Sequence, residues 1–203
     1  VAQVTQEDIV LEIGPGEGIL THALAKTAKK VIAVEKDHNL VTYNLKRITQ
    51  EYSNIEVIEG DIIKLLPNIL RRYTLQDTRY KVVSNIPYYL TSRLFRMLLE
   101  GKIRPHTIVF TIQKEVAQRI IAKPPHMNML ALSIQAFGTP WIVKDVPASC
   151  FWPQPKVDSA IIEISNISDD FFAKNKISQQ FFFTVIRLAY NQKRKLLLNS
   201  IGA

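Results

Sequence analysis

Short apolar runs alternate along the chain with segments whose apolar residues recur at helical spacing. Runs of the first kind predict buried strands, at Val10–Ile13, Val31–Glu35, Ile55–Glu59, Tyr80–Ser84, Thr107–Ile112, Trp141–Val146 and Ala160–Ile164. Segments of the second kind predict helices, at 19–26, 37–48, 91–100, 113–122 and 179–201. Residues 65–80 contain Pro67 and follow neither pattern, so we expect an irregular connection there.

The first predicted strand runs directly into a turn with three glycines, Gly14, Gly16 and Gly18, and then into a predicted helix. Such a turn brings backbone N–H groups and the positive end of a helix dipole close to a ligand, so it predicts a cofactor site. The spacing differs from the dinucleotide fingerprint, because the third glycine comes one residue early and Ile19 occupies the sixth position. A tight turn without a ligand is the alternative.

Acidic residues follow two further predicted strands. Glu35 closes the second strand about 20 residues after the first glycine, where a carboxylate can accept hydrogen bonds from both ribose hydroxyls of a nucleoside. Asp61 follows the third strand, where its carboxylate can accept from an adenine amino group while Ile62 covers the ring. An ordinary turn at residues 60–61 is the alternative. The recurrence of such features at three successive strand ends favours the nucleoside site.

The sequence NIPYY, residues 85–89, follows the fourth predicted strand. Pro87 lacks an N–H group and has a fixed φ, so neighbouring carbonyl groups can point into a pocket. Asn85 adds an amide oxygen, and Tyr88 adds an aromatic face on which an extruded base can stack. The amino nitrogen of adenine is a poor nucleophile, and two neutral acceptors for its hydrogens favour a lone pair directed at a methyl donor. A proline-containing strand end with a core tyrosine is the alternative.

The loop FWPQPKVDS, residues 151–159, separates the last two predicted strands. Its two prolines stiffen the backbone, so the loop can present Phe151 to the mouth of the site at the strand ends. Aromatic loop residues pack against their neighbours more often than they contact a ligand. Packing is therefore the alternative for Phe151.

Composition places the chain among globular proteins. It has 203 residues, of which 47% are hydrophobic and 22% charged, which is enough for one main domain with a small appendage. No apolar run approaches the roughly 20 residues of a membrane span, and no charged-then-apolar leader opens the chain, so we expect a cytoplasmic protein without a membrane partner. Cys150 is the single cysteine and the histidines are scattered, so no metal site is expected.

The formal net charge is +8, and basic residues without acidic neighbours mark the C-terminal part. From residue 171 onward the chain has no Asp or Glu, and its basic residues are Lys174, Lys176, Arg187, Lys193, Arg194 and Lys195. This asymmetry predicts a polyanionic partner, with a solvated helix face as the alternative. The chain begins without methionine and ends directly after a helical pattern, so we expect both ends to be trimmed.

The ordered set of motifs resembles the ribosomal RNA adenine dimethyltransferases of the KsgA type. The resemblance runs through nearly the whole chain and is carried by EIGPGEG, Glu35, Gly60-Asp61, NIPYY, FTIQKEVAQRIIAKP, FWPQPKVDSAII and RLAYNQKRKLLLNSI. It implies an α/β, Rossmann-like class I fold that uses S-adenosylmethionine. The implied sheet has seven strands, mostly parallel with one antiparallel, and helices on both faces.

The resemblance also implies an activity and a substrate. Methyl groups would pass to the N6 amino groups of two adjacent adenosines near the 3′ end of small-subunit ribosomal RNA, with S-adenosylhomocysteine as product. The partner would be this RNA within the immature small ribosomal subunit, and the enzyme a monomer that needs no metal. Such an enzyme would take part in ribosome biogenesis.

Roles for individual residues follow from the same resemblance. The implied cofactor-binding residues are Gly14 and Gly16 at the methionine part, Glu35 at the ribose, Asp61 and Ile62 at the adenine, and Asn85. The implied catalytic residues around the target base are Asn85, Pro87, Tyr88 and Phe151. The expected RNA-binding residues are Arg187, Lys193, Arg194 and Lys195. Residues 1–170 would form the catalytic domain, and residues 171–203 the start of a truncated, helical RNA-binding domain.

The chain departs from the family pattern in two places. Family members carry a basic segment with a GQNFL-like motif before the first strand and a small C-terminal domain, neither of which is found in these 203 residues. We therefore expect a fragment that binds the cofactor but methylates poorly. The alternatives are a methyltransferase acting on DNA adenine or a protein glutamine amide, and a non-catalytic nucleic-acid-binding or ribosome-assembly factor.

Overall fold

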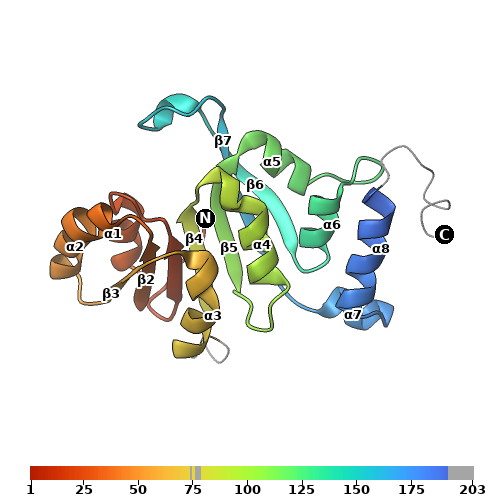
Figure 1. Cartoon of the computed structure of the whole chain (residues 1–203), viewed down its shortest axis with the longest axis horizontal. Helices are drawn as coiled ribbons and strands as arrows, with labels where there is room; N and C mark the ends of the chain where they lie inside the picture. Colours follow the sequence, from red (N-terminus) through yellow and green to blue (C-terminus); the bar gives the residue numbers. More distant parts are fainter. Residues whose placement is uncertain (74, 76–78, 192–203) are drawn as a thin grey trace.

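The computed structural model describes residues 1–73, 75 and 79–191, and its centre is a seven-stranded sheet (Figure 1). The strands are β1 (Ile9–Ile13), β2 (Lys30–Glu35), β3 (Ile55–Glu59), β4 (Tyr80–Asn85), β5 (Thr107–Gln113), β6 (Thr139–Val146) and β7 (Ser159–Ser165). Their order across the sheet is β3-β2-β1-β4-β5-β7-β6. Neighbours from β3 to β5 are parallel, whereas β7 is antiparallel to both β5 and β6. The expected mostly parallel sheet with one antiparallel strand is confirmed.

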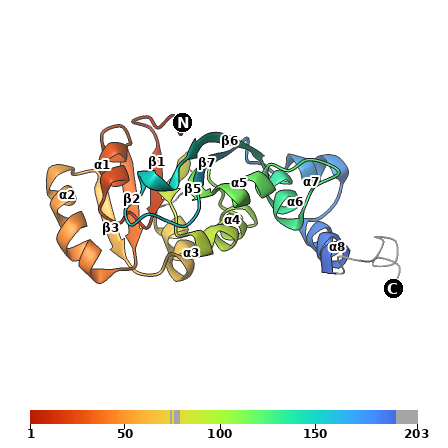
Figure 2. The ribbon, with the colours of Figure 1, turned by 90° about the horizontal axis from the view of Figure 1, so that it is seen from above.

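Helices connect these strands. The α-helices are α1 (Ile19–Ala25), α2 (Lys46–Glu51), α3 (Ile62–Arg72), α4 (Thr91–Leu99), α5 (Lys114–Ile120), α6 (Met129–Gln135), α7 (Asp170–Asn175) and α8 (Gln179–Asn191). A π-helical segment, η1 (Leu40–Leu45), leads into α2, and two 3-10 helices are η2 (Tyr88–Leu90) and η3 (Ala148–Cys150). Seen from above, α1 and α2 lie on one side of strands β1 to β3, and α3 and α4 on the other (Figure 2).

Two hydrophobic cores lie on the two faces of the sheet. Because successive side chains of a strand point to opposite faces, Val10 and Leu11 of β1 belong to different cores. Val10 shares its core with Leu24 of α1 and Ile48 of α2. Leu11 belongs to the larger core with Leu94 of α4. Burial on both faces explains why the central strands are continuous apolar runs rather than alternating ones.

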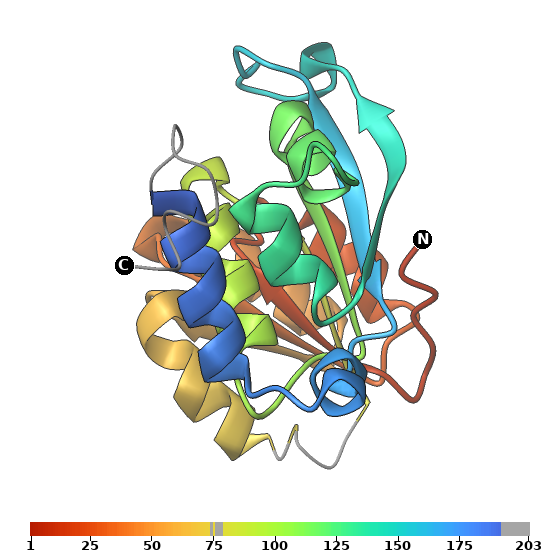
Figure 3. The same cartoon turned by 90° about the vertical axis from the view of Figure 1, so that its right-hand side faces the viewer.

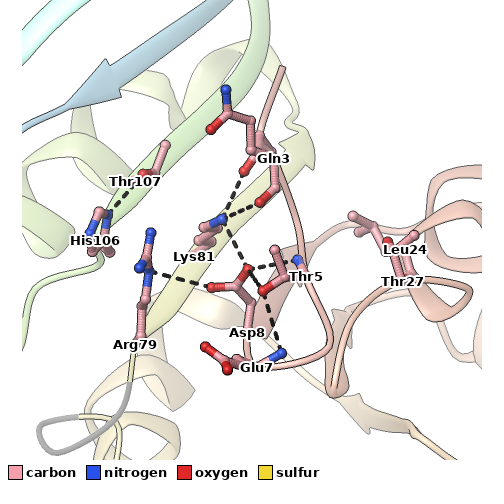
Figure 4. A network of polar contacts seen from close by, with 11 residues as sticks. Gln3, Thr5, Glu7, Asp8, Leu24, Thr27, Arg79, Lys81, His106 and Thr107 are labelled. Carbon is pink, nitrogen blue, oxygen red and sulfur yellow. Dashed lines mark hydrogen bonds and ion pairs between the residues drawn. The ribbon is translucent and has the colours of Figure 1, made fainter.

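A buried lysine on β4 holds the chain segment that precedes β1 (Figure 4). Lys81 Nζ donates to the carbonyl oxygens of Ala2 at 2.9 Å and Gln3 at 2.6 Å, and to Asp8 Oδ2 at 3.0 Å. Thr5 donates to the same carboxylate oxygen from its N and its Oγ1. Since the ammonium group has three acceptors, its burial is compensated. The network therefore fixes the entry into the central strand.

The prediction of an irregular connection at residues 65–80 is wrong over its first part, because α3 extends to Arg72 and contains Pro67. A proline inside a helix removes a backbone hydrogen bond and costs about 3 kcal/mol. Asp61 offsets part of this cost, since its Oδ1 accepts from Ile63 N at 3.0 Å and caps the helix. Burial of the apolar face of α3 offsets the remaining cost. This face consists of Ile62, Leu66, Ile69 and Leu70.

Other helices also differ from the sequence pattern. The helix expected at 37–48 begins as a π-helix at residue 40 and continues through α2 to residue 51. Helices α6, with seven residues, and α7, with six, were not predicted. A cap marks the start of α6, where Asn128 Oδ1 accepts from Ala131 N at 3.0 Å.

Helices α7 and α8 pack against the same body as the sheet (Figure 3). Phe172 of α7 and Phe183 of α8 belong to the larger core, and the Phe183 ring lies 6.1 Å from that of Phe137. Tyr190 Oη donates to the carbonyl of Met127 at 2.9 Å. The division of the chain at residue 170 stays a prediction. Within the described ranges, no helix is long and apolar enough to cross a membrane.

Candidate active site

The turn after β1 has a backbone that glycine adopts more readily than other residues. Gly14, Gly16 and Gly18 have φ values of 65°, 59° and 83°, in the left-handed region that a Cβ disfavours. Gly18 N donates to Pro15 O at 2.9 Å, which closes the turn. A Cβ on Gly18 would overlap Ile48 of α2. The three glycines therefore serve backbone shape and close helix packing.

Gly14 lies beside Pro87, which is distant in the sequence. A Cβ built on Gly14 would be 3.7 Å from Pro87 Cδ, an ordinary van der Waals contact. The reason is topological, because β1 and β4 are parallel neighbours and their carboxyl ends reach the same edge of the sheet. Ile13 N also donates to Ser84 Oγ at 2.7 Å across these two strands. The glycine turn and the NIPYY segment thus form two walls of one site.

Glu35 at the end of β2 is held by backbone N–H groups. Its Oε1 accepts from Lys36 N at 2.7 Å and Asp37 N at 2.9 Å, and its Oε2 accepts from Gly16 N at 3.1 Å. The side chain is buried, so these bonds replace the hydration that the carboxylate loses. Glu35 therefore joins the second strand end to the glycine turn in a defined orientation.

The end of β3 brings Asp61 and Ile62 to the same edge. Gly60 N donates to Glu35 O at 2.7 Å, which fixes the turn against β2. Asp61 Oδ1 caps α3, and its Oδ2 lies 3.9 Å from the exposed Lys36 Nζ. Ile62 is buried at the first position of α3. A carboxylate and an apolar side chain are thus adjacent at this edge, as the nucleoside hypothesis requires.

A cavity of about 300 Å³ lies where these strand ends meet. Its lining includes five of the residues predicted from the sequence, Gly14, Glu35, Asp61, Ile62 and Pro87. A volume of this size falls at the lower end of the range for small-molecule sites. A larger cavity of about 410 Å³ lies among α4, α5, α6 and α8, but none of the predicted site residues lines it. The smaller cavity is therefore the candidate active site.

Comparison with known proteins identifies the family of this chain. A family model described as "Ribosomal RNA adenine dimethylase" matches residues 1–203. The chain belongs to this family. A protein named "Ribosomal RNA small subunit methyltransferase A" from Dehalococcoides mccartyi strain BAV1 is 40% identical over 201 residues, which cover 99% of this chain and 67% of the relative. A protein of the same name from Listeria monocytogenes serotype 4b is 37% identical, over 100% of this chain and 69% of the relative.

Solved structures of other proteins share this fold. The "dimethyladenosine transferase from Plasmodium falciparum" is 32% identical, with a TM-score of 0.83 over 100% of this chain and 70% of that protein. The "23S rRNA methyltransferase ErmE" is 24% identical, with a TM-score of 0.75 over 98% of this chain and 77% of that protein, and shows the fold alone. The expected class I methyltransferase fold is confirmed.

In this adenine dimethylase family member, the NIPYY segment begins with the last residue of β4 and leads into the 3-10 helix η2. Asn85 is exposed and lies opposite Thr111 of β5 in the strand register. Tyr88 is half-buried, and its Oη is 2.7 Å from Ser159 Oγ of β7. Tyr89 is 79% exposed and lines the cavity. The structure thus anchors Tyr88 through its hydroxyl, while the neighbouring tyrosine reaches the cavity wall.

Several residues that line the cavity were not predicted from the sequence. The most polar of them are Lys36, which follows Glu35, and Arg93 on α4. Lys36 could have been found from its position next to a predicted ribose ligand. Arg93 gives no signal in the sequence, because its place depends on how α4 follows the NIPYY turn. These two cations balance the carboxylates of Glu35 and Asp61 around the cavity.

Glu12 is a buried acid directly before the glycine turn. It is 1% exposed, and neither its Oε2 nor the nearby Thr21 Oγ1 has a hydrogen-bond partner among the described residues. Burial raises the pKa of Glu12 from 4.5 to about 7, the neighbouring Thr21 side chain opposes the rise, and the Glu35 carboxylate adds to it. A buried carboxyl with one unpaired oxygen next to the glycine turn in sequence would complement a cationic ligand bound near it.

The other predicted site residues do not line the cavity, and they include Gly16, Asn85 and Tyr88. Phe151 is half-buried in the loop between β6 and β7 and is not among the residues that line the cavity. Arg187 is exposed on α8, and its Nε donates to the carbonyl of Phe183 at 2.9 Å. The predicted RNA-binding residues Lys193, Arg194 and Lys195 lie outside the described residues. Across the described ranges, no group of three or more His, Cys, Asp or Glu could hold a metal ion.

Proposed function

We propose that this chain transfers methyl groups from S-adenosylmethionine to the N6 amino groups of two adjacent adenosines near the 3′ end of small-subunit ribosomal RNA. Membership of the ribosomal RNA adenine dimethylase family supports the substrate class. One structural observation carries the chemistry, namely that the glycine turn and the NIPYY segment meet at Gly14 and Pro87 around one cavity. A donor bound at the turn would therefore face an acceptor held by the segment.

The chain offers a group for each part of the cofactor. Glu35 supplies a fixed carboxylate for the ribose hydroxyls, and Asp61 supplies an acceptor for the adenine amino group. Ile62 would cover the adenine ring from the buried side. The methionine part would lie at Gly14 and Gly16, which have no side chains of their own to exclude it, and the Gly16 N–H is already bonded to Glu35 Oε2. When bound, this cofactor supplies a methyl group already activated by a positively charged sulfur.

Residues of the NIPYY segment would hold the target amino group. The amide oxygen of Asn85 and a backbone carbonyl of the turn accept its two hydrogens, which leaves the nitrogen lone pair directed at the donor. Pro87 carries no N–H group that could compete for this lone pair. Both acceptors are neutral, so they orient the amine without becoming protonated. The protein therefore contributes positioning and polar complementarity, and the released proton passes to solvent.

The exterior of the protein suits an anionic substrate. The formal net charge is +8, and the exposed Arg187 on α8 lies in the part of the chain without acidic residues. We propose that this part of the chain contacts ribosomal RNA, through Arg187 and through the basic residues Lys193, Arg194 and Lys195 that follow it in the sequence. The partner would be the immature small ribosomal subunit, bound by a monomeric enzyme in the cytoplasm. Affinity for RNA should then fall steeply with salt.

Methyl transfer by the 203-residue chain tests this function. Labelled S-adenosylmethionine would be supplied with small ribosomal subunits that lack the modification, with duplex DNA, or with protein. We expect label in two adjacent adenosines of the RNA. Asn85→Ala should lower the rate by about 100-fold, as loss of one polar group at a transition state does elsewhere. Asn175→Ala on the exposed end of α7 is the matched control and should leave the rate unchanged.

Each other outcome has a definite meaning. Preferred labelling of DNA or protein would reject the RNA substrate. Tight RNA binding with neither methyl transfer nor binding of S-adenosylmethionine would favour a non-catalytic assembly factor. Equal rates for wild type and Asn85→Ala would refute the role of Asn85, because a side chain that orients the nucleophile cannot be dispensable.

A further inference from the structure

Trp152 has the highest exposed fraction of the large hydrophobic side chains in the described ranges, at 96%. An indole ring is one of the largest apolar groups a protein can bury, and it is usually packed or placed at an interface. Among the described residues, none covers the Trp152 ring to an appreciable extent. A binding partner of the protein would explain why a tryptophan occupies this position.

The loop that carries Trp152 is fixed at its base. It runs from Pro147 to Asp158, between β6 and β7, and projects beyond the sheet (Figures 1 and 3). Asp158 closes it, since its Oδ1 accepts from Ala148 N at 2.9 Å and its carbonyl accepts from Lys114 N at 3.0 Å. Three prolines within the loop, Pro147, Pro153 and Pro155, restrict its backbone further. A rigid aromatic platform costs little entropy when it binds.

The same loop ends at the candidate active site. Ser159 directly follows it, and Ser159 Oγ lies 2.7 Å from Tyr88 Oη in the NIPYY segment. In the sheet register Ser159 lies opposite Gln113 of β5, and Asn85 lies opposite Thr111 of that strand. The loop therefore emerges from the edge of the sheet at which the target amino group would be held.

We propose that Trp152 stacks on an unpaired base of the RNA next to the target adenosine. This inference rests on the proposed function. Extruding one base from a strand removes the stacking partner of its neighbour, and an exposed indole beside the site can replace that partner. The exposed Lys156 in the same loop supplies a cation that can pair with a phosphate of the bound RNA. The platform would thus position the substrate without touching the reacting atoms.

The two tryptophans of the chain make a matched pair for the test. Trp141→Phe leaves Trp152 as the single tryptophan, and Trp152→Phe leaves Trp141, which is 46% exposed on β6, so excitation beyond the tyrosine band reports one indole in each variant. Each variant would be titrated with an RNA hairpin whose loop carries two adjacent adenosines, and with a fully paired RNA of the same composition. We expect the hairpin to quench Trp141→Phe strongly and Trp152→Phe weakly, and the paired RNA to quench neither strongly.

Steady-state kinetics on small ribosomal subunits supply the second readout. Trp152→Ala should weaken RNA binding and raise the KM for the subunit about tenfold, as expected for loss of one stacked base. Its kcat should stay within about twofold of wild type, because stacking next to the target contributes equally to ground and transition states. Trp152→Tyr, which keeps an aromatic face, should recover most of the affinity.

Contrary results separate this inference from the function on which it rests. If wild type neither binds nor methylates the RNA, the proposed function fails. If wild type methylates and Trp152→Ala has unchanged KM and RNA affinity, only the stacking role is overturned. Quenching of Trp152 by intact small subunits but not by the hairpin would also overturn it, since the loop would then contact a ribosomal protein.

Discussion

The hydroxyl of Tyr88 lies 2.7 Å from Ser159 Oγ, and this bond joins the NIPYY segment to the first residue of β7. Ser159 is completely buried, so its hydroxyl has no water to replace a lost partner. The bond therefore links the predicted target-binding segment to the loop that carries Phe151 and Trp152. Two regions far apart in the sequence are held in register by two side chains.

Removing either hydroxyl should destabilise the protein moderately. We expect Tyr88→Phe and Ser159→Ala each to lower the free energy of unfolding by about 1 kcal/mol, the net value of one buried hydrogen bond. The double variant should lose little more than either single one, because both changes remove the same bond. Denaturant titration of the four proteins measures this. Fully additive losses would mean that the two hydroxyl groups act independently.

Breaking the buried pair of Lys81 and Asp8 should cost more. Lys81→Met leaves the buried Asp8 carboxylate without its main partner and should lower the free energy of unfolding by about 3 kcal/mol. Arg79 also faces Asp8, at 3.7 Å, but its side chain is largely exposed. Arg79→Met is therefore the control and should cost less than about 1 kcal/mol. Similar losses for the two variants would contradict the importance of burial.

The same pair should make stability depend on acid. Burial raises the pKa of Asp8, but the hydrogen bonds from Lys81 and Thr5 and the charge of Lys81 outweigh it and hold the pKa below 3.8. A depressed pKa contributes stability above the unfolded value, and this contribution is lost as the pH falls through the folded value. Unfolding curves below about pH 4 should show the loss in wild type and a smaller one in Asp8→Asn.

Glu12 should have the opposite pH dependence. Its folded pKa of about 7 lies above the ordinary 4.5, so its contribution to stability is present below the lower value and is lost as the pH rises through the upper one. Glu12→Gln should therefore be more stable than wild type at pH 8, by about 3 kcal/mol, with the difference shrinking to below about 1 kcal/mol at pH 5 and vanishing below about pH 4. Glu17→Gln, at an exposed position, is the control. A difference that is the same at every pH would contradict this.

The affinity for S-adenosylmethionine should depend on Glu35 but not on Glu59. Glu35→Gln removes a charged acceptor from the proposed ribose site and should weaken binding of S-adenosylmethionine by about 10-fold to 100-fold. Glu59 lies opposite Glu35 in the register of β2 and β3 but is exposed and paired with His38. Calorimetric titration of Glu35→Gln and Glu59→Gln compares them. If both variants weaken binding equally, Glu35 does not bind the ribose.

The sequence by itself determined the order of strands along the chain and the shape of the glycine turn. Strand ends were predicted to within two residues, and for β1, β2, β4 and β5 the reason is that a strand buried on both faces is a nearly uninterrupted apolar run. Gly14, Gly16 and Gly18 were found because positive φ angles restrict the residue type. The ordered motifs also sufficed for the family, since they need no knowledge of contacts.

Tertiary structure alone decided which of these residues meet. Local sequence argues against a helix at Pro67, yet burial of one face and the Asp61 cap outweigh the lost hydrogen bond. Tyr88 and Tyr89 are adjacent and chemically alike, and only packing against Ser159 determines which ring reaches the cavity. The contact between Gly14 and Pro87 likewise follows from the pairing of β1 with β4. Such choices depend on burial and on partners remote in sequence, which no local pattern encodes.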